Sequence, residues 1–261
     1  MTSEFSEKIV VVTGGSRGIG YAIAAAFAHA GAQTVLAASS RDNLEAAADA
    51  IAAAGGKKPF VVAGDLRRQE AAEQLFEAVR GRYGRCDVLI NAAGAARSGT
   101  FFQLTDEDFR DGFALKFFAA VALCRLFWPL LKESRGAIVN IAGNNARTPD
   151  IDSLIGGSVS AALANVSKGL AGLGNRDDVN VNVIHPGATD TDRMRAMFAQ
   201  RAAAAGTTPE DVRAAVLQRD GVRRIGLPED IAELALFLCS RQARYIQGVA
   251  ISVDGGANRG V

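Results

Sequence analysis

Short runs of consecutive apolar residues alternate along the chain with longer segments in which apolar residues are spaced as on one face of a helix. The apolar runs lack the regular polar interruptions of a half-exposed strand, which is typical of strands buried on both sides in a parallel sheet. They predict seven strands, at residues 9–12, 34–38, 60–63, 87–90, 137–142, 180–184 and 249–253.

The segments between these strands predict the helices, at residues 19–30, 43–54, 70–82, 105–131, 160–173, 190–220 and from Pro228 onward. Thr105 and Asp108 have the spacing of a capping box, and Pro228 suits the first turn of a helix. Because strands and helices alternate throughout, we expect an α/β fold with a Rossmann-type, doubly wound parallel sheet of seven strands and helices on both faces. No linker or repeat divides the chain, so residues 1–261 are predicted to form a single domain.

A glycine-rich turn joins the first predicted strand to the first predicted helix. It contains Gly14, Gly18 and Gly20. Glycine lets a backbone turn tightly and approach a ligand closely, and the start of a helix attracts phosphate groups. A strand, a glycine turn and a helix in this order predict a dinucleotide-binding site.

The spacing of these glycines, together with three later motifs, resembles the short-chain dehydrogenase/reductase family. The four motifs, in chain order, are Gly14-x-x-x-Gly18-x-Gly20, Asn91-Ala92-Ala93-Gly94, Pro186-Gly187-Ala188-Thr189-Asp190-Thr191 and Val253-Asp254-Gly255-Gly256. The resemblance implies an oxidoreductase that transfers a hydride between a nicotinamide cofactor and a small carbonyl or alcohol substrate. It also implies a homo-oligomer, a dimer or a tetramer.

The same resemblance implies a set of cofactor-binding residues, most of them at the ends of predicted strands. Asp65 would accept a hydrogen bond from the adenine amine or else cap a helix, Asn91 would support the strand ends, and Thr191 would hold the carboxamide. The full set is Gly14, Ser16, Arg17, Gly18, Ile19, Gly20, Ser39, Arg41, Asp65, Leu66, Asn91, Ala92, Gly94, Lys168, Pro186, Gly187 and Thr191.

The end of the second predicted strand indicates the choice of cofactor. An NAD site needs an acidic residue there to bind the ribose 2′-hydroxyl, and this chain has Ala38. Arg17 and Arg41 can instead pair with a 2′-phosphate, and Ser39 can donate a hydrogen bond to it. The sequence therefore predicts NADP(H), with NAD as the alternative.

The family's catalytic residues are a serine, a tyrosine, a lysine four residues after the tyrosine, and an asparagine from the preceding helix. Aligned on the dipeptide Ser167-Lys168, the lysine position holds Lys168 and the tyrosine position holds Ala164. Gly143 occupies the serine position and Lys116 the asparagine position. The chain therefore resembles a divergent member that lacks the usual serine and tyrosine.

Two lysines are the candidate catalytic residues. We expect Lys116 and Lys168 to share one cleft, where repulsion and desolvation would lower their pKa values from about 10.4 and allow one to act as an acid. The alternative is that Lys168 only holds the ribose while Lys116 is solvated. Ser160, one turn before Ala164, is a further hydroxyl on the same face.

Two segments are candidates for covering the substrate. Residues 145–158 make the interval between Gly143 and Ala164 longer than the family usually shows, and predict either a lid or a variable surface loop. Residues 190–220 predict a helical cover. Without the tyrosine, two other functions stay open: a nucleotide-binding protein without redox activity, and a non-redox enzyme whose lysine forms a Schiff base.

Composition narrows the partners. A net charge of +1 gives no indication of nucleic acid binding. Residues 113–131 are apolar but contain Lys116, Arg125 and Pro129, so we expect a buried or subunit-facing helix and not a membrane span. This helix is apolar on more than one face, which also predicts a homo-oligomer. Three cysteines without a C-x-x-C pattern favour the cytoplasm, and no Cys/His cluster predicts a metal site.

Overall fold

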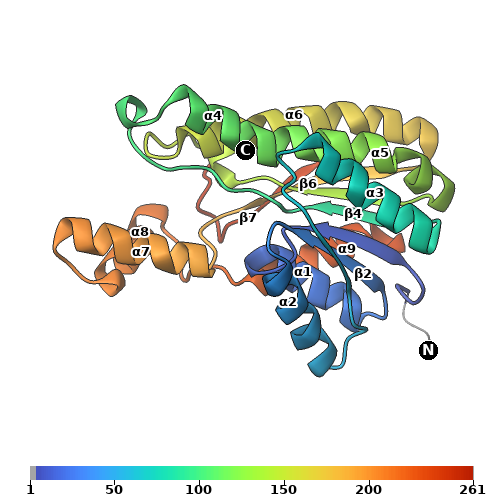
Figure 1. The fold of residues 1–261 in the computed structure, drawn as a ribbon. Coiled ribbons are helices and arrows are strands. Elements are labelled where there is room, and N and C mark those ends of the chain that lie inside the picture. The colour runs from blue at the N-terminus through green and yellow to red at the C-terminus, as the bar shows by residue number, and fades with distance from the viewer. Residues whose placement is uncertain (1–3, 261) are drawn as a thin grey trace.

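The computed structural model describes residues 4–260, which form one parallel sheet covered by helices on both faces (Figure 1). The strand order is β3-β2-β1-β4-β5-β6-β7, and every neighbouring pair is parallel. This confirms the predicted fold class. The strands are β1 (Ile9–Thr13), β2 (Gln33–Ala38), β3 (Phe60–Ala63), β4 (Val88–Asn91), β5 (Ala137–Ile141), β6 (Asn180–Pro186) and β7 (Ala250–Val253).

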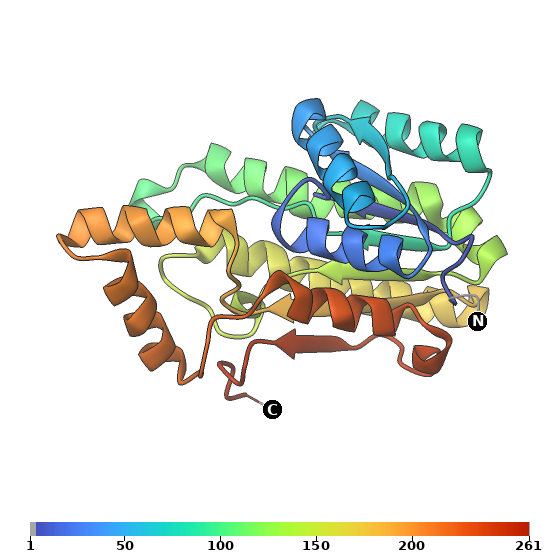
Figure 2. The same cartoon turned by 90° about the horizontal axis from the view of Figure 1, so that it is seen from below.

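Alternate residues of the strands face two separate apolar layers. Val10 and Val12 of β1 pack with α1 (Gly18–His29), α2 (Arg41–Ala53) and α9 (Pro228–Leu238). Val11 points to the opposite layer. That layer is formed with α3 (Gln69–Tyr83), α5 (Ala119–Ser134) and α6 (Leu154–Asp177). Figure 1 shows the two helix layers on either side of the sheet, and Figure 2 looks onto the layer that contains α1 and α9. Because both faces are covered, the continuous apolar runs of the sequence are explained.

One long helical segment runs along one face of the sheet (Figure 1). It begins as α4 (Asp106–Phe113), capped by Thr105, widens into a π-helical turn at Ala114–Phe118, and continues as α5. By length and composition Asp106–Ser134 is apolar enough to cross a membrane. Leu123 and Phe127 are nevertheless buried against the sheet, as in a core helix of this fold class.

The segment predicted as a helical cover is two helices, α7 (Asp192–Ala205) and α8 (Pro209–Asp220). Gly206 ends α7 in the left-handed conformation, with φ of +64°, and Thr208 caps α8. The pair stands out from the sheet at the left of Figure 1 and has a small apolar cluster of its own. It is therefore a separate unit placed over the carboxyl ends of the strands.

Helix α6 begins at Leu154, earlier than the predicted start at residue 160. The early turns contain Gly156 and Gly157, which lower helix propensity and made this stretch resemble a loop. The connection after β5 is correspondingly shorter and contains a 3₁₀ helix at Asn144–Ala146. The long loop predicted at residues 145–158 is thus wrong in its second part.

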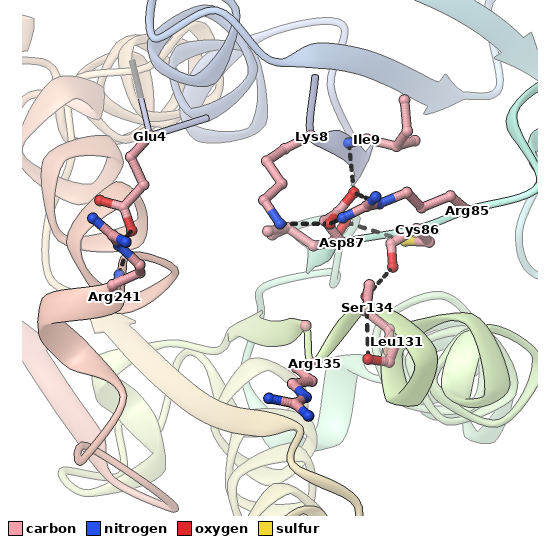
Figure 3. Close-up of polar contacts among 12 residues, drawn as sticks. Glu4, Lys8, Ile9, Arg85, Cys86, Asp87, Leu131, Ser134, Arg135 and Arg241 are labelled. Carbon is pink, nitrogen blue, oxygen red and sulfur yellow. Dashed lines mark hydrogen bonds and ion pairs between the residues drawn. The ribbon is translucent and has the colours of Figure 1, made fainter. Parts of the chain in front are cut away.

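The opposite edge of the sheet, at the amino ends of the strands, is held by a buried carboxylate (Figure 3). Asp87 accepts hydrogen bonds from Lys8 Nζ at 2.9 Å, from the Ile9 amide at 3.0 Å and from Arg85 Nε at 2.8 Å. Burial alone would raise the pKa of Asp87, but these hydrogen bonds hold it below its usual range. The hydrogen bonds of Asp87 therefore join the amino end of β1 to that of β4, at the end of the sheet away from the candidate site.

Candidate active site

The loops after β1 and β4 lie together where the strand order reverses, the usual ligand position in such sheets. Gly14 and Gly18 have φ of +66° and +56°, which glycine adopts readily. A Cβ on Gly20 would lie 2.3 Å from the Gly14 carbonyl oxygen, so no other residue fits there without movement. The start of α1 has no side-chain cap, which leaves its amide groups for an anion.

A cavity of about 390 Å³ extends from this loop along the ends of β2, β3 and β4. It brings together twelve of the seventeen residues predicted to bind the cofactor. They are Gly14, Ser16, Arg17, Gly18, Ile19, Gly20, Ser39, Asp65, Leu66, Ala92, Gly94 and Thr191. Asp65 is not the cap of α3, since that helix begins at Gln69; it accepts hydrogen bonds from Arg67 instead.

The other five predicted residues lie outside this cavity. The prediction that Arg41 binds the cofactor is the main one to correct. Its side chain is 63% exposed and pairs with Glu45 one turn later, at 3.7 Å. Asn91 is buried behind the cavity, while Pro186 and Gly187 line a neighbouring cavity. Lys168 lies elsewhere, as described below.

The charges in the cavity fit a dinucleotide. Arg193 donates hydrogen bonds to the carbonyl oxygens of Gly94, at 3.4 Å, and Ala96, at 2.8 Å. Desolvation and the nearby charge of Arg17 lower the pKa of Arg193. Across residues 4–260, neither of these two arginines pairs with an acidic side chain. Two guanidinium groups beside a helix start, without a counter-charge, match a pyrophosphate.

A second cavity, of about 650 Å³, lies under α7 and α8 and is floored by Lys116, Gly143, Gly156 and Ser160. Lys116 comes from the π-helical turn. Its Nζ donates hydrogen bonds to the Ala142 carbonyl oxygen at 2.6 Å and to Ser160 Oγ at 3.1 Å. Burial, and to a smaller extent the charge of Arg193, lower the pKa of Lys116 to about 8. The group can therefore exchange a proton near neutral pH.

Glycines leave room beside this ammonium group. A Cβ on Gly143 would lie 3.2 Å from Ser160 Oγ and 3.9 Å from Lys116 Nζ, so both polar groups occupy the position next to the missing side chain. A Cβ on Gly156 would lie 3.0 Å from Ser153 Oγ, and apart from its chain neighbours and the backbone of α6 no other atom of the described residues would lie within 4 Å of it. His185 Nδ1 donates to the Gly143 carbonyl oxygen at 2.8 Å, which fixes the backbone here. The result is an open pocket with one cationic proton donor on its floor.

Lys168 does not share this pocket, so the predicted pair of adjacent lysines is wrong. Its Nζ donates to the Gly248 carbonyl oxygen at 2.9 Å, and with Ala164 it lines a different cavity against the start of β7. Gly248 lies next to Val181, near the amino end of β6. Lys168 is therefore two turns of α6 away from Ser160, toward the far edge of the sheet.

The preceding residue explains why this part of α6 carries a serine. Ser167 is buried and accepts a hydrogen bond from Asn140 Nδ2 at 2.8 Å, while Asn91 Nδ2 donates to Asn140 Oδ1 at 2.8 Å. This chain of bonds joins β4, β5 and α6. Ser167 thus anchors the helix to the sheet, and the next side chain along the helix turns away from the site.

Comparison with known proteins agrees with this geometry. A family model described as enoyl-(acyl carrier protein) reductase, one of the short-chain dehydrogenase models, matches residues 14–258. The chain belongs to the short-chain dehydrogenase/reductase family. Among curated members, an uncharacterized oxidoreductase of Mycobacterium tuberculosis is 34% identical over 96% of this chain and 92% of its own length. The 7alpha-hydroxysteroid dehydrogenase of Escherichia coli is 31% identical, over 95% of this chain and 93% of its own.

Solved structures of other short-chain dehydrogenases/reductases superpose along the whole chain. The L-sorbose reductase of Gluconobacter frateurii, complexed with NADPH and L-sorbose, is 33% identical, with a TM-score of 0.94 and complete coverage of both chains. The NADPH-dependent reductase of bacilysin biosynthesis is 30% identical with a TM-score of 0.90, covering 98% of this chain and all of its own.

Sequence reasoning missed three features of the site. Gly156 was assigned to a loop, and Ser160 was noted only as a further hydroxyl of α6. Arg193 was overlooked, although it follows Thr191 by two residues at the start of a predicted helix. Its position directly after a predicted cofactor-binding motif was the available signal.

Proposed function

We propose that this chain interconverts a carbonyl compound and its alcohol with NADP(H), and that Lys116 is the proton donor. The observation that carries the proposal is the ammonium group of Lys116, buried on the floor of the larger cavity beside the cofactor cavity. The names of the relatives, an oxidoreductase, a dehydrogenase and a reductase, support the redox chemistry.

The positions of the family's catalytic residues support a divergent site. The family needs two α6 positions one turn apart that face the active cavity. In this structure the two that do so, beside Gly143, are Gly156 and Ser160. We therefore place the tyrosine position at Gly156 and the lysine position at Ser160, in correction of the alignment on Lys168. The only amine that lines this cavity is then Lys116, on the π-helical turn, where the family has its lysine on α6.

The chemistry requires a hydride, a proton and a bound carbonyl. When bound, the nicotinamide cofactor supplies the hydride. The substrate oxygen fits in the space left by Gly143 and Gly156. Lys116 donates a hydrogen bond to that oxygen, stabilises the negative charge that develops on it, and transfers a proton to give the alcohol. The neutral amine then regains a proton from solvent, and Ser160 and the Ala142 carbonyl oxygen hold the amine in position.

The cofactor cavity supports NADP(H). Ala38 lines it where an NAD site would have an acid, and Ser39 and Arg17 line it as well. The L-sorbose reductase complexed with NADPH has the same fold over the full length of the chain, and the bacilysin reductase, which covers 98% of the chain, is NADPH-dependent. Arg41 would have to leave Glu45 to contribute.

The proposal is tested by NADPH oxidation with a panel of aldehydes and ketones, comparing wild type with Lys116→Met. We expect kcat to fall by about 100-fold or more, the usual contribution of a general acid, while the Kd for NADPH changes little. Lys168→Met is the matched control, since it removes the same charge from a separate cavity, and should keep full activity.

Equal turnover by Lys116→Met and wild type would overturn the assignment of the acid. Tight NADPH binding by wild type without oxidation by any carbonyl compound, and without NADP⁺ reduction by any alcohol, would favour a nucleotide-binding protein without redox activity. Loss of activity in Lys168→Met alone would restore the original alignment.

We also propose that the protein is a cytoplasmic homo-oligomer. Phe118 is 61% exposed and its ring contacts that of Phe117, which in turn contacts Phe113. A second copy would remove this apolar surface from water. Light scattering at micromolar concentration should exceed the 27.2 kDa of a single chain; a monomer would refute the proposal. The three free cysteines, at residues 86, 124 and 239, support a reducing compartment, which cell fractionation can test.

A further inference from the structure

The larger cavity contains a second positive charge without an acidic partner, on helix α7. Its lining includes Arg201 of α7, Arg219 of α8, and the acidic residues Asp150 and Asp220. Arg219 Nε lies 2.7 Å from Asp220 and its NH1 3.9 Å from Asp150, so two carboxylates neutralise it. The side chain of Arg201 forms no hydrogen bond or ion pair with any other residue between 4 and 260.

The position of Arg201 on α7 directs it toward substrate. Met194, Met197 and Phe198 precede it by one and two turns and also line the cavity, so the four residues share one face of the helix. Val216 of α8 completes the apolar wall. A half-buried guanidinium group next to this wall has lost part of its hydration, and no acidic side chain of the described chain replaces it.

The positive side chains that line the cavity outnumber the negative ones by one. With Lys116 protonated, its lining has three cations and two carboxylates. A single carboxylate on the substrate would balance this difference, and the planar guanidinium group of Arg201 can bind it through two parallel hydrogen bonds. The same cavity has the proton donor Lys116 on its floor, so the carbonyl group of the substrate would lie there while the carboxylate lies at Arg201.

We propose that the substrate is a carbonyl compound, or the corresponding alcohol, whose hydrocarbon chain ends in a carboxylate bound by Arg201. This inference rests on the function proposed above. The carbonyl oxygen lies against Lys116, the hydrocarbon part contacts Met197 and Phe198, and the carboxylate reaches α7. Arg201 thus determines specificity and does not take part in the proton transfer.

The test compares keto acids of increasing chain length with their methyl esters, which keep the carbonyl group and remove the charge. In wild type we expect kcat/KM for the best acid to exceed that for its ester by about tenfold or more, the usual size of a charge-assisted hydrogen bond. Arg201→Met should bring this ratio close to one without changing the value for the ester. Arg201→Lys should restore part of it.

Arg213→Met is the matched control, because this exposed arginine of α8 lies outside the cavity and its loss should not change the ratio. Equal kcat/KM for acid and ester in wild type, or an unchanged ratio in Arg201→Met, would overturn the inference while ester reduction leaves the proposed function intact.

If neither compound is reduced, the redox proposal fails, and calorimetry of the same keto acids decides the present one. Binding to wild type but not to Arg201→Met would support the carboxylate site. No binding, or binding unaffected by the substitution, would refute it.

Discussion

Replacing Lys116 should stabilise the protein while it removes activity. The buried ammonium group has a pKa of about 8 against an ordinary 10.5, because burial penalises its charged form. At about 1.4 kcal/mol per pKa unit, the charge costs the folded state roughly 3 kcal/mol. In Lys116→Met, Ser160 and the Ala142 carbonyl oxygen lose their hydrogen-bond donor, which offsets about 1 kcal/mol.

The net gain in the free energy of unfolding is therefore about 2 kcal/mol near pH 7, or a rise in Tm of roughly 4–8 °C for a chain of this size. The gain depends on pH. Below pH 8 both the folded and the unfolded protein hold the proton, so the full penalty is present. Between pH 8 and 10.5 the folded state releases the proton first, the unfolded state binds more protons, and the stability of wild type rises.

The assay is thermal unfolding of wild type and Lys116→Met at pH 7 and at pH 10. All other titrating groups are the same in both proteins, so their effect cancels in the difference in stability. We expect the variant to be more stable at pH 7 and the difference to shrink at pH 10. A variant that is less stable at pH 7, or a difference that does not change with pH, would refute the assignment of a buried, destabilising charge to this lysine.

Three further substitutions test the cofactor cavity through the Kd values of the reduced cofactors. Ala38→Asp should shift preference toward NADH by about tenfold, because a carboxylate repels the 2′-phosphate; an unchanged NADPH/NADH ratio would contradict this. Gly20→Ala should weaken NADPH binding at least about tenfold with the fold retained in circular dichroism, since its Cβ would overlap the Gly14 carbonyl; unchanged affinity would mean that the loop adapts. Arg193→Met should weaken both cofactors about tenfold, whereas a loss confined to NADPH would place this arginine at the 2′-phosphate.

The strands could be predicted from the sequence because burial on both faces leaves a distinct apolar run for each. Predicted and observed limits agree within a residue or two, as in the strand at residues 60–63, which is β3. The helices were less certain where glycine interrupts them. Gly156 and Gly157 are inside α6, where packing against the short 3₁₀ helix at Asn144–Ala146 overrides their low propensity.

The cofactor cavity was largely predictable, since its residues follow strand ends and occur in contiguous motifs. The floor of the cavity under α7 and α8 could not be predicted in the same way. The dipeptide Ser167-Lys168 has the sequence of a family motif. In the structure, however, Ser167 accepts a hydrogen bond from Asn140, and Lys168 faces another cavity. Only the position of α6 along the sheet shows that Ser160 and Gly156 face Lys116. Such a register is fixed by tertiary packing and leaves no local mark in the sequence.

The π-helical turn at Ala114–Phe118 makes the site sensitive to the number of residues in this helix as well as to their identity. Each residue of an α-helix advances its direction by about 100°. A π-helical turn holds one residue more than a regular turn, so removing one residue here would convert it into a regular turn and leave α4 and α5 facing as before. Only the residues inside the turn, Lys116 among them, would change direction. A single codon deletion would therefore turn the ammonium group away from the cavity while α5 stays packed on the sheet through Phe127.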